Sequence, residues 1–272
     1  MSATPLVSVL MTSYNREKYI AQAIESVLVS SYRNFELIIV DDCSGDKTVE
    51  IAKGYAAKDE RVKVYVNEKN LGDYPNRNKA ASYARGKYIK YLDADDLIYY
   101  YGLEVMINYM ERFPSAGFGL ASIVSNENPF PICIGPAAIY LENFDGFGHF
   151  SRAPGSSIIR LDSFTKVGGF SGARMIGDFE LWCKLGRYYD MVKFPFDLYW
   201  NRLHDEQESK SEYAKQYPVL IEKVLSEALS HPECPLNPTE LDTIKKMLSK
   251  QRIRGRALNV LSKMNRLIRP RK

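Results

Sequence analysis

The sequence is poor in the residues that build metal-stapled or disulfide-stapled folds. Only four of its 272 residues are cysteine, they lie far apart, and no C-x-x-C pair occurs. This usage argues against a zinc ribbon or a disulfide framework and is typical of a reducing compartment. The chain also lacks a run of about 18 uncharged apolar residues, so we expect no membrane-spanning helix. No basic region precedes an apolar stretch at the N-terminus, and we therefore expect no signal peptide and a cytoplasmic location.

What is present is an ordinary globular composition, with 45% hydrophobic and 26% charged residues. A chain of this length can bury a full core as one large domain, or as a domain with an appendage. Charge is uneven, because residues 245–272 hold eleven lysines and arginines and no acid; subtracting them from the net charge of +4 leaves −7 for the rest. Nucleic-acid binding is not favoured, since the body is acidic and the tail has no aromatic side chain for stacking.

The basic tail also has an apolar component. From residue 244 to residue 272, apolar side chains interleave with the cations. This pattern is typical of amphipathic helices that lie on an anionic membrane, which would place the protein peripherally on the inner face. The alternative is a C-terminal helix that packs on the domain and exposes a solvated basic face. We expect helices at about 215–230, 238–250 and 252–268.

Strand-like and helix-like segments alternate over residues 5–95. Apolar runs at 6–11, 35–40, 62–66 and 88–92 are separated by helical spacing at 18–29, 47–57 and 76–84, the last starting just after Pro75. The alternation predicts an α/β fold with a Rossmann-like, mostly parallel central sheet flanked by helices on both faces. Farther along, we expect helices at 103–113, 162–167 and 178–188, strands at 117–124, 156–160 and 191–200, and an irregular segment at 126–148.

Three of the predicted strands end in polar clusters. Asp93, Asp95 and Asp96 follow the fourth strand, and the clusters 12–15 and 41–46 follow the first two. The carboxyl ends of parallel strands share one edge of a sheet, where ligands bind in open α/β folds, so we expect one site. Carboxylates two positions apart on a turn can converge on a hard cation that holds a phosphorylated ligand. The alternative is a solvated acidic turn.

Seven motifs occur in a familiar order: Val7–Asn15, Ile39–Ser44, Asn70–Asn78, Gly86–Asp96, Val167–Phe170, Gly177–Trp182 and Tyr199–His204. Together they resemble family 2 glycosyltransferases, which are inverting enzymes with the GT-A fold, of the bacterial polysaccharide and glycolipid type. The resemblance covers about residues 5–210. It implies a nucleotide-sugar donor, with a UDP-sugar favoured, and a saccharide or lipid-linked saccharide acceptor.

The resemblance places several of these residues around the donor nucleotide. Thr12 and Tyr14 are expected at the base, with Asp42, and Asp41 as a second choice, accepting an N–H from the base edge. Both acids have an alternative role as turn formers and helix caps. Arg77 falls beside the diphosphate, where a cationic fork suits phosphate oxygens. The alternative for Arg77 is an ordinary surface arginine.

The resemblance also implies a cofactor, Mn²⁺ or Mg²⁺, at the D-x-D motif. Asp95 is expected to coordinate the ion directly, and Asp93 to bind the ribose or a metal-bound water. Asp96 assists them or caps the next helix. His204 is a further candidate metal ligand, and its alternative is a structural histidine.

Asp178 matches the catalytic base of the family, at the start of a helix. An inverting displacement needs one base to take the proton of the incoming hydroxyl. The alternative for Asp178 is a helix cap, and Glu180 is a second candidate base. This chain departs from the family at Gly177, where a glutamate is common, and at Asp73-Tyr74-Pro75, where small residues are common. The second departure is expected to reshape the donor pocket.

We therefore predict an inverting hexosyltransferase with a GT-A catalytic domain at residues 1–212 and a helical C-terminal extension at 213–272. The nucleotide-binding half is expected at 1–96 and the acceptor half at 97–212. Two other functions stay open: a nucleotidyltransferase, which usually has a glycine-rich basic loop after its first strand, and a non-catalytic nucleotide- or sugar-binding scaffold.

Overall fold

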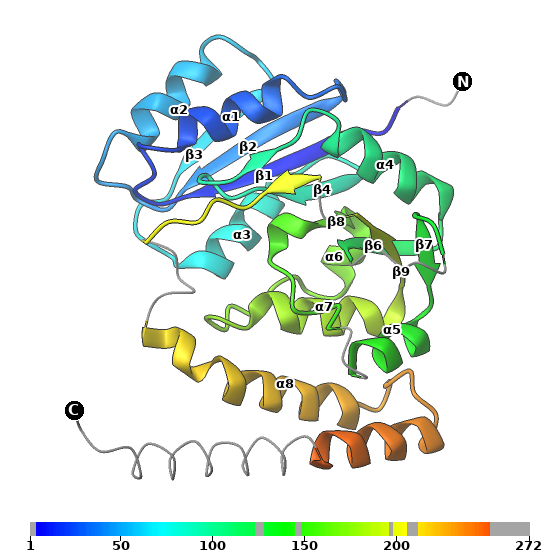
Figure 1. Ribbon diagram of the computed structural model, residues 1–272. Helices are drawn as coiled ribbons and strands as arrows, with labels where there is room; N and C mark the ends of the chain where they lie inside the picture. The colour runs from blue at the N-terminus through cyan, green and yellow to red at the C-terminus, as the bar shows by residue number, and fades with distance from the viewer. Residues whose placement is uncertain (1–3, 123–127, 145–147, 196–197, 206–211, 251–272) are drawn as a thin grey trace, which may run out of the picture.

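One large sheet organises the chain (Figure 1). A computed structural model describes residues 4–122, 128–144, 148–195, 198–205 and 212–250. In these residues the large sheet has eight strands in the order β3-β2-β1-β4-β8-β6-β9-β7, and β5 and β10 form a separate pair. The strands are β1 (Val7–Ser13), β2 (Phe35–Asp41), β3 (Val62–Val66), β4 (Tyr88–Tyr91), β5 (Leu97–Ile98), β6 (Ala116–Ala121), β7 (Ile132–Ile134), β8 (Ser157–Arg160), β9 (Asp190–Phe194) and β10 (Tyr199–Trp200).

Most of the sheet is parallel, as predicted. Strands β1 to β4 are parallel to one another, and β6 is parallel to β9. The inserted strand β8 is antiparallel to both β4 and β6, and the edge strand β7 is antiparallel to β9. Because β1, β2 and β4 point the same way, their carboxyl ends lie at one edge.

Helices cover both faces of the sheet because strand side chains alternate between two cores. On β1, Val7, Val9 and Met11 enter a core shared with α1, α2 and α4, whereas Leu10 enters the opposite core with α3, α5, α6, α7 and α8. The helices are α1 (Ile20–Leu28), α2 (Thr48–Ala56), α3 (Asp73–Ser82), α4 (Gly102–Arg112), α5 (Pro136–Glu142), α6 (Leu161–Lys166), α7 (Gly177–Tyr188) and α8 (Tyr217–Ser230).

Three of the predicted elements were wrong in extent. The segment 126–148, which was expected to be irregular, contains β7 and α5; Pro136 occupies the first turn of α5, where a missing N–H costs nothing. The helix expected at 76–84, just after Pro75, begins at Asp73, because proline is tolerated in the first turn of a helix. The single strand expected at 191–200 is two strands, β9 and β10.

The C-terminal helices pack on the domain. Val224 and Ala228 of α8, and Ile244 of the helical segment at 238–250, are buried in the same core as α7. Figure 1 shows α8 beneath α7 and α5. The helix expected at 252–268 lies outside the described residues, and none of the described helices is long and apolar enough to cross a membrane. The domain boundaries stay a prediction.

Candidate active site at the carboxyl edge of the sheet

Three carboxylates meet at the turn that follows β4. Asp93, Asp95 and Asp96 each place one oxygen within 4.8 Å of the others. A hydrogen bond of 3.0 Å from the Asp96 N–H to the Asp93 carbonyl closes the turn. Three carboxylate oxygens this close together are the ligands that hard divalent cations prefer.

Burial and mutual repulsion oppose ionisation of these carboxylates. Burial, and next the charge of Asp93, raise the pKa of Asp96 to about 7. Burial also raises the pKa of Asp93. The buried Oδ1 of Asp93 lies 2.7 Å from Arg77 Nη2 but has no partner of hydrogen-bond geometry in the described part of the chain. A cation would offset the excess negative charge of the three carboxylates, so these residues fit a divalent metal.

Asp95 receives contacts from two distant segments. Arg16 Nε lies 2.9 Å and His204 Nε2 lies 3.0 Å from Asp95 Oδ2. Arg16 comes from the loop after β1 and His204 from the segment after β10, so both segments converge on the turn after β4. The predicted candidate ligand His204 is thus in contact with the carboxylate cluster, through Asp95.

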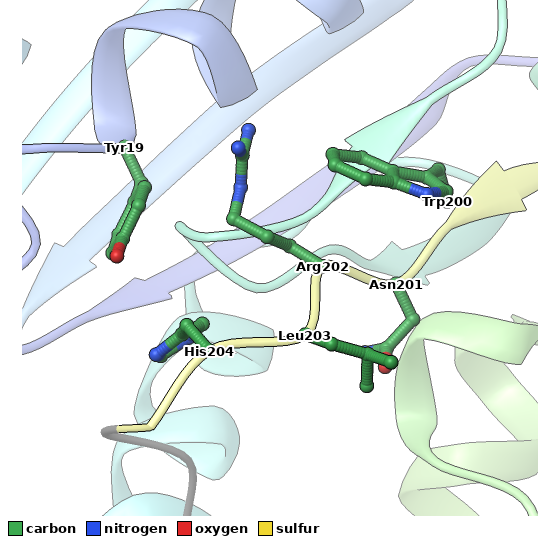
Figure 2. A pocket seen from close by; sticks show the side chains of 6 residues that line it. All are labelled: Tyr19, Trp200, Asn201, Arg202, Leu203 and His204. Atoms are coloured by element: carbon green, nitrogen blue, oxygen red, sulfur yellow. The ribbon is translucent and has the colours of Figure 1, made fainter.

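A pocket of about 420 Å³ lies beside the cluster, and Figure 2 shows its lining residues, Tyr19, Trp200, Asn201, Arg202, Leu203 and His204. The guanidinium of Arg202 lies 5.1 Å from the Tyr19 ring centroid and 4.8 Å from that of Trp200. Arg202 also donates from Nε to the Asp95 carbonyl at 2.9 Å and from its backbone N–H to Asp96 Oδ1 at 3.0 Å. These bonds fix the wall of the pocket to the carboxylate turn.

The two acids at the end of β2 hold loops together. Asp41 accepts hydrogen bonds from the Ser13 hydroxyl at 2.8 Å and from the Ser44 N–H at 2.7 Å. Asp42 accepts from the Asn67 side chain and from two backbone N–H groups, at 2.8, 2.8 and 2.9 Å. Both carboxylates therefore have the loop-forming role that we gave as the alternative, at the edge where we expected the nucleotide.

The other two residues that were predicted to contact the nucleotide base, Thr12 and Tyr14, lie at the carboxyl end of β1. Thr12 pairs in register with Val40 and is partly exposed, and Tyr14 is 47% exposed. Their exposure leaves both side chains accessible to a ligand at the edge that carries Asp41 and Asp42.

Arg77 is a buried residue of α3, so the alternative of a surface arginine is wrong. Its side chain is 7% exposed, with Nε 2.8 Å from Asp73 and Nη2 2.7 Å from Asp93. Its Nη1 is buried and has no hydrogen-bond partner among the described residues. Arg77 thus links α3 to the carboxylate turn.

Asp178 lies in the first turn of α7, where its Oδ1 accepts the N–H of Phe179 at 2.7 Å. Burial raises the pKa of Asp178 to about 6, although the Phe179 N–H and Arg77 act to lower it. The N-cap position of α7 belongs to Ile176, so Asp178 is not the capping residue. Glu180 is engaged elsewhere, by the Ser171 hydroxyl and by Lys184 at 3.2 Å.

Three residues at the site escaped the sequence analysis. Lys90 is fully buried in β4 and donates to the carbonyl groups of Tyr91 and Gly155; burial lowers its pKa to about 7. A lysine within an apolar strand was the available signal, since buried lysines are rare. The other two residues had no sequence signal, because only the fold brings them to the site. Arg16 contacts Asp95, and Tyr217, at the start of α8, lies near Asp178.

Sequence comparison places the chain among known proteins. The profile described as Glycosyl transferase family 2 matches residues 8–177. An uncharacterized glycosyltransferase of Methanocaldococcus jannaschii is 48% identical over 110 residues, which are 40% of this chain and 38% of that protein. TuaG of Bacillus subtilis, named for teichuronic acid biosynthesis, is 44% identical over 120 residues, 43% of this chain and 48% of that protein. The chain spans less than half the length of these curated relatives.

Solved structures share the arrangement of strands and helices. TarS of S. aureus in complex with UDP-GlcNAc has a TM-score of 0.69 at 21% identity, covering 88% of this chain and 70% of that chain. The mannosyltransferase PcManGT of Pyrobaculum calidifontis, in complex with GDP-Man and Mn²⁺, has a TM-score of 0.61 at 16% identity, covering 98% and 81%. At these identities the likeness concerns the fold.

The buried pair of Arg77 and Asp93 predicts a coupled loss of stability. Arg77→Met should lower the free energy of unfolding by about 3–5 kcal/mol, because it leaves the Asp93 carboxylate buried without its cation. Adding Asp93→Asn should restore part of that loss, by roughly 0.5–3 kcal/mol. Urea unfolding followed by circular dichroism measures both. The half-buried pair of Arg61 with Asp59 is the control, and Arg61→Gln should cost less than about 1 kcal/mol. Additive effects of the two site variants would contradict the coupling.

Asp178 should reduce stability at neutral pH. Its folded pKa of about 6 exceeds the ordinary value of 3.8, so the native state binds the proton more tightly than the unfolded state. Stability from this group is therefore lost as pH rises from about 4 to about 6, and the loss is complete above that range. Asp178→Asn should raise the free energy of unfolding by roughly 1–3 kcal/mol at pH 7.5 and by little at pH 4.

A carboxylate with the opposite shift provides the control for this stability test. The Arg61 side chain holds the pKa of Asp59 below its ordinary value. Asp59→Asn should therefore reduce stability at pH 7.5. A stability gain of Asp178→Asn that does not change with pH would contradict the assignment of a raised pKa.

Proposed function

The chain belongs to glycosyl transferase family 2 and has the GT-A fold that its sequence predicted, and we propose that it transfers a sugar from a nucleotide-diphosphate sugar to an acceptor hydroxyl with inversion. The observation that carries this proposal is that α3 joins two acidic centres. Its Arg77 pairs with Asp93 of the carboxylate cluster, and its Tyr74 acts on Asp178. One centre suits a metal-bound diphosphate and the other a general base.

The donor nucleotide is proposed to lie over the ends of β1 and β2. Tyr14 is exposed enough to stack on a base, and Thr12 borders the same surface. A carboxylate offers about four acceptor positions, so Asp42, with three hydrogen bonds made, keeps capacity for an N–H of a uracil-like edge. Asp41 supports that position through Ser44. A UDP-sugar is the favoured donor.

The diphosphate is proposed to lie over the carboxylate turn, beside the contact between Arg77 and Asp93. Arg77, paired with Asp93, is assigned as the cation beside the diphosphate. Asp95 is assigned as a direct ligand of Mn²⁺ or Mg²⁺, His204 as a further ligand, and Asp93 to the ribose or a metal-bound water. When bound, the cation supplies Lewis-acid stabilisation of the charge that develops on the departing nucleotide.

Asp178 is assigned as the base. It takes the proton of the acceptor hydroxyl as that oxygen attacks the anomeric carbon and the bond to the nucleotide diphosphate breaks. A carboxylate whose pKa is raised to about 6 is still ionised at neutral pH and is a stronger base than an ordinary aspartate. Displacement by one base needs no carboxylate nucleophile and inverts the anomeric centre.

Two features support a saccharide or lipid-linked saccharide acceptor. One is the name of the B. subtilis relative, which refers to teichuronic acid biosynthesis. The other is the basic segment 244–272. Ile244 packs in the core of the domain, and the cationic side chains of the segment are proposed to contact an anionic membrane from the cytoplasmic side; residues 251–272 lie outside the described residues. The catalytic domain at 1–212 and the extension at 213–272 are part of the same proposal.

A nucleotidyltransferase and a binding scaffold are the competing functions. The loop after β1 contains Tyr14, Asn15 and Arg16 and has no glycine, unlike the usual phosphate-binding loop of nucleotidyltransferases. A scaffold has no need for Asp178 to be buried with a raised pKa, which costs stability. Both observations favour glycosyl transfer.

Nucleotide release from a panel of UDP-, GDP- and dTDP-sugars tests the proposal. One donor should be consumed with Mn²⁺ or Mg²⁺, and chelation should stop the reaction. Asp178→Asn should lower kcat by about 10²–10⁴-fold while nucleotide binding persists. Asp95→Asn should remove the response to metal.

Glu180→Gln is the matched control on the same helix, two residues after the base. It should retain activity, because Lys184 and Ser171 already occupy the Glu180 carboxylate. Wild-type turnover in Asp178→Asn would contradict the assignment of the base. Formation of nucleotide-sugar from a nucleoside triphosphate and a sugar phosphate would favour the nucleotidyltransferase.

A further inference from the structure

Helices α3 and α7 pack closely at the start of α7, next to the proposed catalytic base Asp178. A Cβ added to Gly177 would lie 2.8 Å from the Tyr74 ring, which is closer than side-chain carbons approach. The ring is 5% exposed, and the Phe170 ring centroid lies 5.1 Å from it. Tyr74 therefore fills the space that a side chain at position 177 would need, next to Asp178.

The hydroxyl of Tyr74 acts on the Asp178 carboxylate. Burial raises the pKa of Asp178, and the nearby Tyr74 side chain is one of the smaller effects that lower it. In turn burial, and next the Asp178 charge, raise the pKa of Tyr74 above its ordinary range, so the phenol stays protonated. The phenol can therefore act only as a donor toward the carboxylate.

Other charged and titratable groups also face Asp178. From α3, Arg77 lowers and Asp73 raises the pKa of Asp178. From α8, Tyr217 is close enough that Asp178 contributes to raising its pKa, after the larger effect of burial. Tyr74 differs from them because it combines a donor to the carboxylate with the packing contact that fixes the first turn of α7.

We propose that Tyr74 is a positioning residue for the base: its ring fixes the first turn of α7 at Gly177, and its hydroxyl orients the Asp178 carboxylate. This inference rests on the proposed function only in giving Asp178 the role of base. During transfer the proton moves from the acceptor hydroxyl to Asp178, and Tyr74 keeps its own proton. Gly177 and Tyr74 act together, since the Tyr74 ring occupies the space that a side chain at position 177 would need.

Tyr74→Phe tests the positioning role, because it keeps the ring and removes only the donor. Titration of Asp178 by carboxyl ¹³C NMR in the full chain should give a pKa of about 6 in the wild type. In Tyr74→Phe that pKa should rise by roughly 1 unit, because the donor that stabilises the charged form is gone. The acid limb of kcat/KM against pH should move in the same direction. Tyr83→Phe is the control. Tyr83 caps the same helix at its C-terminus and stacks on Tyr65, so this change should alter neither the pKa of Asp178 nor the pH profile of kcat/KM.

Gly177→Ala tests the packing half. It should reduce kcat with little change in KM for the donor, because the displaced Tyr74 ring moves the base and not the nucleotide site. An unchanged pKa of Asp178 in Tyr74→Phe would overturn the inference even if activity falls. Retained turnover in Asp178→Asn would instead overturn the proposed function, so the two failures are distinguishable.

Discussion

The buried guanidinium of Arg77 is the constraint on which the site depends. It contacts Asp73 on its own helix and Asp93 on the turn after β4, so it fixes α3 to the carboxyl edge of the sheet. The contact with Asp93 is costly to break, because the guanidinium is 7% exposed and would stay in a low-dielectric environment without its partner. The same helix carries Tyr74 against Gly177 and Asp178. The geometry of the carboxylate cluster and that of Asp178 are therefore set by one element.

The sheet makes this arrangement rigid. Strands β1, β2 and β4 are buried on both faces and end at the same edge, so the loops that follow them have little freedom in where they begin. Side chains from those loops then bind one another: Arg16 contacts Asp95, and Asp41 accepts from Ser13 and Ser44. Polar groups that a solvated turn would expose are thereby preorganised around the place where we propose the nucleotide lies. Raised pKa values at Asp96 and Asp178 are the electrostatic result of this burial.

Local patterns predicted much of this from the sequence. The apolar run before Asp93 predicted β4 and the exit of the carboxylates, because strand identity and a strand end are local properties. The start of α3 and the presence of α5 were missed, since proline breaks a helix interior but is tolerated in its first turn, where Pro75 and Pro136 lie. The pairing of Arg77 with Asp93, and the contact between Tyr74 and Gly177, join residues far apart in the chain. One sequence shows each partner but not the packing that brings them together.

The most direct test of the account is a crystal structure with UDP and Mn²⁺, with anomalous differences measured at the manganese edge. The account predicts one anomalous peak at about 2.0–2.6 Å from an Asp95 oxygen and from diphosphate oxygens, the usual range for oxygen ligands of hard cations. It also predicts that Arg77 contacts the diphosphate and that Asp178 faces the open position where the sugar would lie. A nucleotide bound away from the ends of β1, β2 and β4, or a manganese ion without an Asp95 ligand, would contradict it.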